Sequence, residues 1–269
     1  MRGQGLSPVP FFTRQGDLFQ PTDMSRGPWS PTDLHGRVVV GLLGAEAERA
    51  VGDDAFMPAR LTVDMYRMPD LSPLSVTTRL LRDGGRIKLV EAELLRGDVS
   101  MARAVVLFLR KTANAGGAVW SPPPWAVPAP ADIPEPADIR AAMNGMWAVR
   151  PISGGFGMPG KRQIWMSEVR PLVDDDPWTP FSRVAVAADF ASPFANSGEG
   201  MLGYINTDVS VYLHRLPATA WIGFEVVNHH AADGVAIGEC WLHDEQGAIG
   251  TATVAALAQK MPAGIVGRK

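Results

Sequence analysis

Residues 35–51, HGRVVVGLLGAEAERAV, predict a helix that the rest of the chain must enclose. Its first turns are apolar on every side, and most of its charge lies toward its end, in Glu46, Glu48 and Arg49. A helix that is apolar all round is stable only when other elements cover it. The residues that leave no polar side are Val38, Val39, Val40, Leu42 and Leu43. The sequence therefore predicts a central helix around which the other elements are arranged.

The sequence also predicts how this helix begins and why it contains two glycines. We expect the N-cap to be Ser30, Thr32 or Asp33, because short side chains with an oxygen cap helices well. Gly41 and Gly44 lower the helix propensity of the segment. We expect their use to be close packing, in which a sheet approaches the helix axis where side chains are missing.

A second helix is predicted because the first one is repeated. Residues 182–189, SRVAVAAD, follow the pattern of residues 36–43, GRVVVGLL. Asp189 stands where the first helix has Leu43. The repeat therefore predicts two similar helices, the second of which ends in a carboxylate.

The strands repeat as well, with an offset of 148 positions. Residues 60–69, RLTVDMYRMP, alternate apolar and polar side chains, which is typical of a half-buried strand. Residues 209–217, VSVYLHRLP, keep the same apolar phase, so that Val211 matches Val63. A slip of one residue would turn the apolar side chains outward, so the shared phase indicates two copies of one unit.

Each copy is predicted to carry an antiparallel sheet on its helix. Turn signals such as Asp83-Gly84-Gly85 separate apolar-rich runs that are long enough for strands. These runs lie at residues 74–82, 86–96 and 101–111 in the first copy, and at 163–169, 221–228, 236–243 and 249–259 in the second. The fold class is therefore α+β.

A proline-rich segment divides the two copies. Residues 121–138, SPPPWAVPAPADIPEPAD, admit neither a continuous helix nor a central strand, because proline lacks the backbone N–H. We interpret this segment as a linker. The predicted organisation is an N-terminal unit at 1–120, the linker at 121–138 and a C-terminal unit at 139–269.

Composition excludes several classes of function. The 46% hydrophobic and 20% charged residues are typical of a soluble globular protein. A net charge of -3 gives no basic surplus for nucleic acid, and no apolar run reaches the length of a membrane span. Cys240 is the only cysteine, so no intrachain disulfide can form, which favours a reducing cytoplasm. We expect a cytoplasmic protein that binds no nucleic acid and has no membrane span.

The repeated arrangement resembles the double hotdog fold of the acyl-CoA thioesterase II family and its thioesterase-like relatives. In that fold two tandem units each wrap an antiparallel sheet around a central helix. The residues that carry the resemblance are Asp33-Leu34-His35-Gly36, residues 61–69, Ala187-Ala188-Asp189-Phe190, residues 205–217 and residues 244–253, DEQGAIGTAT. The resemblance implies an enzyme of lipid metabolism that hydrolyses acyl-CoA or another acyl thioester.

The resemblance also implies a catalytic site in the second unit. In the family an Asp, a Thr or Ser, and a Gln orient a water that attacks the thioester carbonyl. The Asp corresponds to Asp189, and the Thr position falls on Asn206, with Thr207 beside it. The Gln position falls near Ala255, which has no amide. We therefore expect Asp189, Asn206 and Thr207 to be the catalytic residues.

Substrate contacts are expected at the start of the first helix. Backbone N–H groups at His35 and Gly36 could polarise a thioester oxygen, because helix N-termini favour negative charge. His229 and His230 lack the spacing and the further ligands of a metal site, so we expect neither metal nor cofactor.

Three functions remain open from the sequence. The first is an acyl-CoA thioesterase, the second a binding module that holds acyl-CoA without turnover, and the third a hotdog hydratase of enoyl thioesters. We also expect that whole chains can pair into a homo-oligomer through exposed sheet faces.

Overall fold

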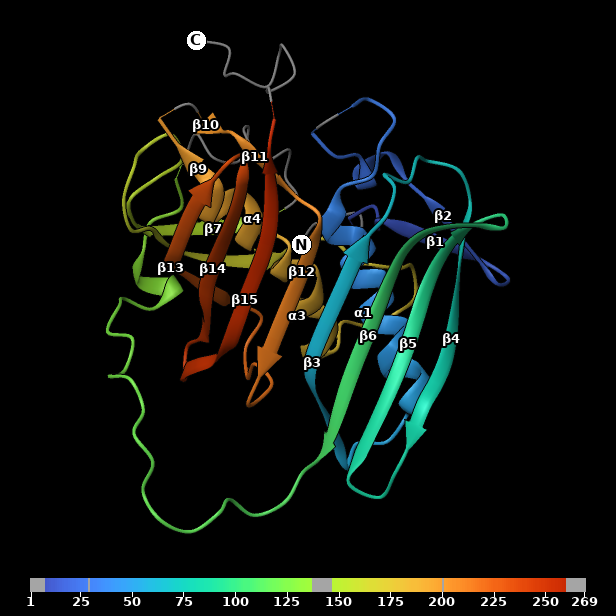
Figure 1. The fold of residues 1–269 in the computed structure, drawn as a ribbon, viewed down its shortest axis with the longest axis horizontal. Coiled ribbons are helices and arrows are strands. Elements are labelled where there is room, and N and C mark those ends of the chain that lie inside the picture. Colours follow the sequence, from blue (N-terminus) through green and yellow to red (C-terminus); the bar gives the residue numbers. More distant parts are fainter. Residues whose placement is uncertain (1–7, 29, 137–146, 200, 260–269) are drawn as a thin grey trace, which may run out of the picture.

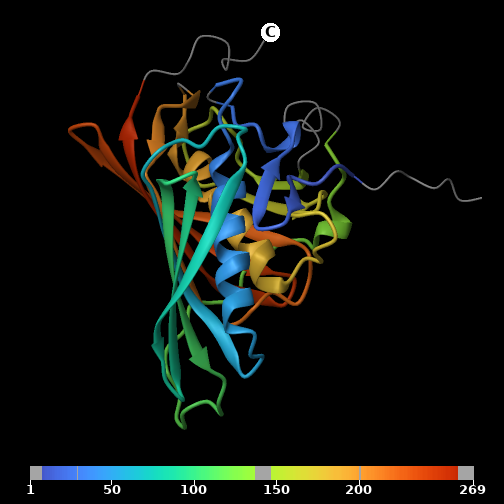
Figure 2. The same cartoon turned by 90° about the vertical axis from the view of Figure 1, so that its right-hand side faces the viewer.

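The computed structural model describes residues 8–28, 30–136, 147–199 and 201–259. Its helices lie against one face of a large antiparallel sheet (Figures 1 and 2). The strands of the first half are β1 (Phe12–Gln15), β2 (Leu18–Pro21), β3 (Phe56–Met65), β4 (Leu74–Asp83), β5 (Ile87–Arg96) and β6 (Val99–Arg110). Those of the second half are β7 (Trp147–Ser153), β8 (Gln163–Glu168), β11 (Tyr204–Asn206), β12 (Asp208–Leu213), β13 (Ile222–Ala232), β14 (Val235–Asp244) and β15 (Gly247–Ala258). Two short strands, β9 (Ser197–Gly198) and β10 (Met201–Leu202), pair separately.

Helix α1 (Gly36–Val51) confirms the central helix predicted for residues 35–51. The five apolar residues of its first turns are each at most 2% exposed. Its N-cap is His35, whose side chain accepts a hydrogen bond from the Arg37 backbone, so the prediction of a cap among Ser30, Thr32 and Asp33 is wrong. The helix ends at Val51, and the C-cap Gly52 takes the left-handed conformation common after a last helical turn.

The second predicted helix is present as α3 (Pro180–Ala188), followed at once by α4 (Ala191–Asn196). Thr179 and Ser182 form a capping box at the start of α3. In the described residues no helix is long and apolar enough to cross a membrane.

The two long helices pack antiparallel, and glycine makes the contact possible. A Cβ at Gly41 would overlap the Val186 side chain, and one at Gly44 would lie 2.8 Å from the Ala185 Cβ. The predicted use of these glycines in close packing is therefore confirmed, but the approaching element is α3 and not a sheet.

The sheet runs without a break from one half of the chain to the other. Its order is β1-β2-β4-β5-β6-β3-β12-β15-β14-β13-β8-β7, with β11 beside β15. The order is mirrored about the central pair of β3 and β12. Outward from β3 it runs β6-β5-β4-β2-β1, and outward from β12 it runs β15-β14-β13-β8-β7, which are the equivalent strands of the second half.

The register at this central pair is the one that the 148-residue repeat requires. Val63 lies opposite Val209, and Leu61 lies opposite Val211. Between them Thr62 faces Ser210, and their hydroxyl oxygens are 3.3 Å apart. The offset of 148 positions converts one pair into another: adding it to Leu61 gives Val209, and subtracting it from Val211 gives Val63. The pairing is therefore symmetric about Thr62 and Ser210.

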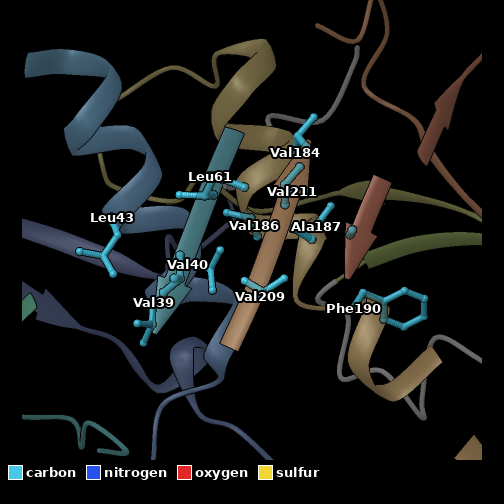
Figure 3. Close-up of a cluster of buried hydrophobic side chains, with 14 of the residues drawn as sticks. Val39, Val40, Leu43, Leu61, Val184, Val186, Ala187, Phe190, Val209 and Val211 are labelled. Carbon is cyan, nitrogen blue, oxygen red and sulfur yellow. The ribbon is translucent and has the colours of Figure 1, made fainter. Parts of the chain in front are cut away.

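The core is shared between the halves of the chain. Figure 3 shows side chains of α1, α3, β3 and β12 meeting in one cluster. The labelled residues are Val39, Val40, Leu43, Leu61, Val184, Val186, Ala187, Phe190, Val209 and Val211, and each is at most 4% exposed. Neither half could bury these side chains alone.

The proline-rich segment is extended between β6 and a short 3-10 helix at Pro130–Asp132 (Figure 1). It is anchored by Trp125, which stacks on His243 at 4.1 Å and meets Trp165 edge-on at 4.9 Å. The end of the predicted linker, residues 137–138, lies outside the described residues.

We expect Gly41→Ala to lower the free energy of unfolding by about 1–3 kcal/mol, the usual cost of overpacking a core. The loss should occur although alanine has the higher helix propensity. Thermal or urea unfolding measures it.

The control is Gly85→Ala, since nothing lies within 4 Å of a Cβ built there. Adding Val186→Ala to Gly41→Ala should recover stability, because it removes the overlapping side chain. If the double variant lost as much unfolding free energy as the two single variants together, the contact between positions 41 and 186 would be contradicted.

Candidate active site

The antiparallel helix pair brings the start of α1 against the end of α3. Asp189 is the C-cap residue of α3 and is 5% exposed. Its carboxylate lies beside Gly36, where a Cβ would be only 2.9 Å from Oδ2. Glycine at position 36 therefore lets the carboxylate reach the first turn of α1.

Asn206 completes this contact from strand β11. Its Nδ2 donates to Asp189 Oδ1 at 2.9 Å and to the Asp208 carbonyl oxygen at 3.1 Å. Both amide hydrogens are thus used, while the amide oxygen of Asn206 has no hydrogen-bond partner among the described residues and can accept from another group. Asp189 and Asn206, predicted from the sequence as neighbours in one site, are brought together.

Burial raises the pKa of Asp189 above its ordinary value. The hydrogen bond from Asn206 and the charge of Arg37 act in the opposite direction but do not outweigh it. The carboxylate is therefore a stronger proton acceptor, once ionised, than one in water.

His35 lies on the other side of the carboxylate. Its Nδ1 is 3.7 Å from Asp189 Oδ2 and accepts from the Arg37 backbone N–H at 3.4 Å. Burial, assisted by the charge of Arg37, lowers the pKa of His35 to about 3, so the imidazole is neutral. With Nδ1 as the acceptor, the proton is assigned to Nε2. His35 and Gly36 thus adjoin Asp189, as the sequence suggested.

A buried ion pair supports the site and was not predicted. Arg37 is 0% exposed, and its Nη1 donates to Glu168 Oε1 at 2.6 Å. Trp147 donates to the same oxygen at 2.7 Å, and its ring lies 4.1 Å from the guanidinium carbon. The sequence feature that could have indicated this ion pair is Arg37, the single charged residue in the apolar first turns of the helix predicted at residues 35–51.

Thr207 is not part of the arrangement. The residue forms the bend between β11 and β12, and its side chain is exposed. Its hydroxyl lies 3.5 Å from the Ala255 carbonyl oxygen. The structure therefore brings together four of the five predicted residues and leaves Thr207 outside.

The register of β11 on β15 shows which residue near Ala255 lies opposite Asn206. Asn206 lies directly opposite Ala256, and Ala256 is buried on the same inner face. Ala255 is exposed on the other face, where its N–H donates to Asp208 Oδ1 at 2.6 Å. A side chain that reached toward Asn206 would have to come from position 256.

Within the described residues no group of three or more His, Cys, Asp and Glu side chains is arranged to hold a metal ion. The chemistry available at the site is that of a buried carboxylate, an amide and the backbone N–H groups of a helix start.

Asp189→Asn is expected to raise the melting temperature at pH 7. A carboxylate whose pKa is higher in the folded than in the unfolded state stabilises the fold below its unfolded pKa. That stabilising contribution is lost as the pH rises through the pKa that the carboxylate has in the folded state. The gain over wild type should therefore shrink as the pH falls toward about 4, the ordinary aspartate pKa.

Thermal unfolding at several pH values measures this effect, with Asp17→Asn in an exposed turn as the control. A melting temperature of Asp189→Asn below that of wild type at pH 7 would show that the ionised carboxylate is net stabilising.

Models of known protein families match both halves of the chain. The family model of the acyl-CoA thioesterase N-terminal domain matches residues 25–109, and that of the C-terminal domain matches residues 122–257. No curated protein matches the chain.

Solved structures show the same fold. The TesB protein of Mycobacterium avium subsp. paratuberculosis has a TM-score of 0.68 at 18% identity, over 93% of this chain and 96% of that one. A candidate thioesterase of Novosphingobium aromaticivorans DSM 12444 has 0.71 at 21%, over 94% and 100%. A protein of unknown function with a hot dog fold, from Alicyclobacillus acidocaldarius, has 0.68 at 16%, over 93% and 96%. The two domain matches together span most of the sequence, and the chain belongs to the acyl-CoA thioesterase family.

Proposed function

We propose that the protein hydrolyses acyl-CoA thioesters to a free acid and CoA, with a water activated by Asp189 and oriented by Asn206. The observation that carries the proposal is the 2.9 Å hydrogen bond between these residues at the start of α1. It aligns a proton acceptor and a polar amide beside a helix N-terminus. Family membership supplies the thioester as the class of substrate.

The chemical step follows from the charges at the site. Ionised Asp189 takes a proton from water while the water oxygen forms a bond to the thioester carbonyl carbon. The carbonyl oxygen gains negative charge, which favours the positive end of α1. The Gly36 N–H donates to no backbone carbonyl among the described residues, which leaves it available as a donor. The carbon–sulfur bond then breaks, and the proton held by Asp189 passes to the sulfur of CoA.

His35 and the buried ion pair act as supports in this proposal. Neutral His35 can donate from Nε2 without adding charge beside Asp189. Arg37, fixed by Glu168 and Trp147, favours the ionised form of Asp189.

We also propose the double hotdog arrangement, with units 1–120 and 139–269 and the linker 121–138. The mirrored strand order and the register of β3 on β12 support it. The proposal includes a cytoplasmic location, in keeping with the free thiol of Cys240. Whole chains would pair through the outer sheet face, where Leu109 and Tyr212 are exposed.

One observation favours a second function, a module that binds acyl-CoA without turnover. Ala256 faces Asn206 where an amide side chain could hold the attacking water. Without that group the water is oriented by fewer contacts, which lowers the rate of attack.

Asp189→Asn should lower thiol release from acyl-CoA by about a hundredfold or more, because it removes the proton acceptor. Asn206→Ala should lower it less. Wild-type activity should fall as the pH drops through the raised pKa of Asp189, so that half-activity occurs above the ordinary aspartate range. A thiol reagent measures release from a panel of acyl chain lengths.

Equal rates for wild type and Asp189→Asn would remove Asp189 from the mechanism. No release from either, together with thermal stabilisation by acyl-CoA, would instead establish the binding module.

Ala256→Gln is expected to raise the rate of thiol release if the missing amide limits it, since its side chain would face Asn206. Ala255→Gln is the matched control, because the same side chain would lie on the exposed face. An equal effect of both variants would contradict the inward position assigned to residue 256.

A further inference from the structure

A second feature of the C-terminal half has no role in the proposed chemistry. A cavity of about 520 Å³ lies between the end of α4, strand β13 and the loop before β8. Its polar and aromatic lining includes Lys161, Arg162, Asn196, Tyr204, Asn228 and His229. The volume is in the range of small-molecule sites, which combine apolar walls with a few polar groups.

Asn196 lies at the wall of this cavity with its amide unused. The residue is 4% exposed, and neither Oδ1 nor Nδ2 has a partner among the described residues. Leaving a buried amide unpaired costs free energy, and such groups in native proteins call for an explanation. Strand β14 even makes room for it, since a Cβ at Gly238 would lie 3.3 Å from Asn196 Oδ1.

The cavity also carries positive charge. Arg162 is 3% exposed and donates to the carbonyl oxygens of Ser197 at 2.7 Å and Ala195 at 3.2 Å. It pairs with no carboxylate among the described residues. Lys161 adds an ammonium group, which contacts Glu225 at 3.2 Å, and the described lining residues include no Asp or Glu. A ligand with acceptor oxygens or negative charge would be favoured here.

The cavity lies within reach of the Asp189–Asn206 pair. Asn196 follows Asp189 by seven residues along α3 and α4, which corresponds to about 10 Å of helix. Tyr204 precedes Asn206 by two residues on β11, so it lies on the same face and about 7 Å away. A molecule whose reacting bond lies at Asp189 could therefore extend into the cavity.

We propose that this cavity binds the phosphopantetheine arm of the thioester substrate, an assignment that rests on the proposed function. The arm carries one amide close to the sulfur, a second amide further along and a phosphate at its far end. The N–H of the outer amide can donate to Asn196 Oδ1 while the carbonyl oxygen of the inner amide accepts from Asn196 Nδ2, which satisfies both unused atoms. Lys161 and Arg162 provide positive charge for the phosphate.

The test uses CoA itself as the ligand, so that binding is measured without turnover. Asn196→Leu should weaken CoA binding in calorimetry by about tenfold, the loss expected for one or two hydrogen bonds. The same change should raise the melting temperature of the ligand-free protein, because it removes a buried unpaired amide. Lys161→Ala should weaken CoA binding by a few-fold, and more at low than at high salt.

A kinetic comparison locates the effect on the arm. For one acyl group, Asn196→Leu should raise the KM of the CoA thioester more than that of the N-acetylcysteamine thioester, which lacks the outer amide and the phosphate. The control is Lys111→Ala, an exposed lysine just after β6 in the other half of the sheet, which should change neither value.

Equal KM changes for both thioesters, or unchanged CoA binding by both variants, would overturn the assignment. Stabilisation of wild type by a free fatty acid but not by CoA would overturn it in favour of an acyl-chain site. Wild type that binds CoA through Asn196 but releases no thiol from any acyl-CoA would refute the proposed hydrolysis and leave the cavity assignment in place.

Discussion

The close antiparallel contact of α1 with α3 is the constraint on which the rest of the structure depends. Gly41 and Gly44 bring the helix axes together against Val186 and Ala185. At that separation β3 and β12 can pair as neighbours and continue one sheet across both halves. The same contact carries the start of α1 to the end of α3, where Asp189 lies. Packing and chemistry therefore share one origin, because a wider spacing would open the core and move the carboxylate away from Gly36.

The two halves are alike in backbone and unlike in chemistry. The strand order is mirrored about β3 and β12, and the register follows the 148-residue repeat. Yet Asp189, which aligns with Leu43 in the sequence repeat, is the C-cap of α3, whereas Leu43 lies within α1. A carboxylate buried in one copy and an apolar side chain in the other confine the candidate chemistry to one end of the helix pair.

The site is built from groups that cost stability in isolation. Burial of Asp189 opposes the ionisation of its carboxyl group. The charges of Arg37 and Glu168 are removed from water together. Such pairs are costly to break, because either partner alone would leave an uncompensated buried charge. Asn196 adds an unpaired amide beside the cavity. Buried polar groups of this kind are consistent with binding and catalysis and do not stabilise the core.

The sequence by itself determined the helices, most strands and the repeat, because apolar periodicity reports which faces must leave water. It also indicated Asp189, Asn206, His35 and Gly36, since a carboxylate at the end of an apolar helix is unusual and the resemblance named its partners. Only the tertiary structure decided that His35 caps α1, that Gly41 faces α3, that Thr207 points outward and that position 256 faces Asn206. Each of these depends on the register of strands or the approach of helices far apart in sequence. The conformational preference of a short segment carries no information on which distant segments it contacts. The Arg37–Glu168 pair and the cavity at Asn196 therefore could not be found before the fold was known.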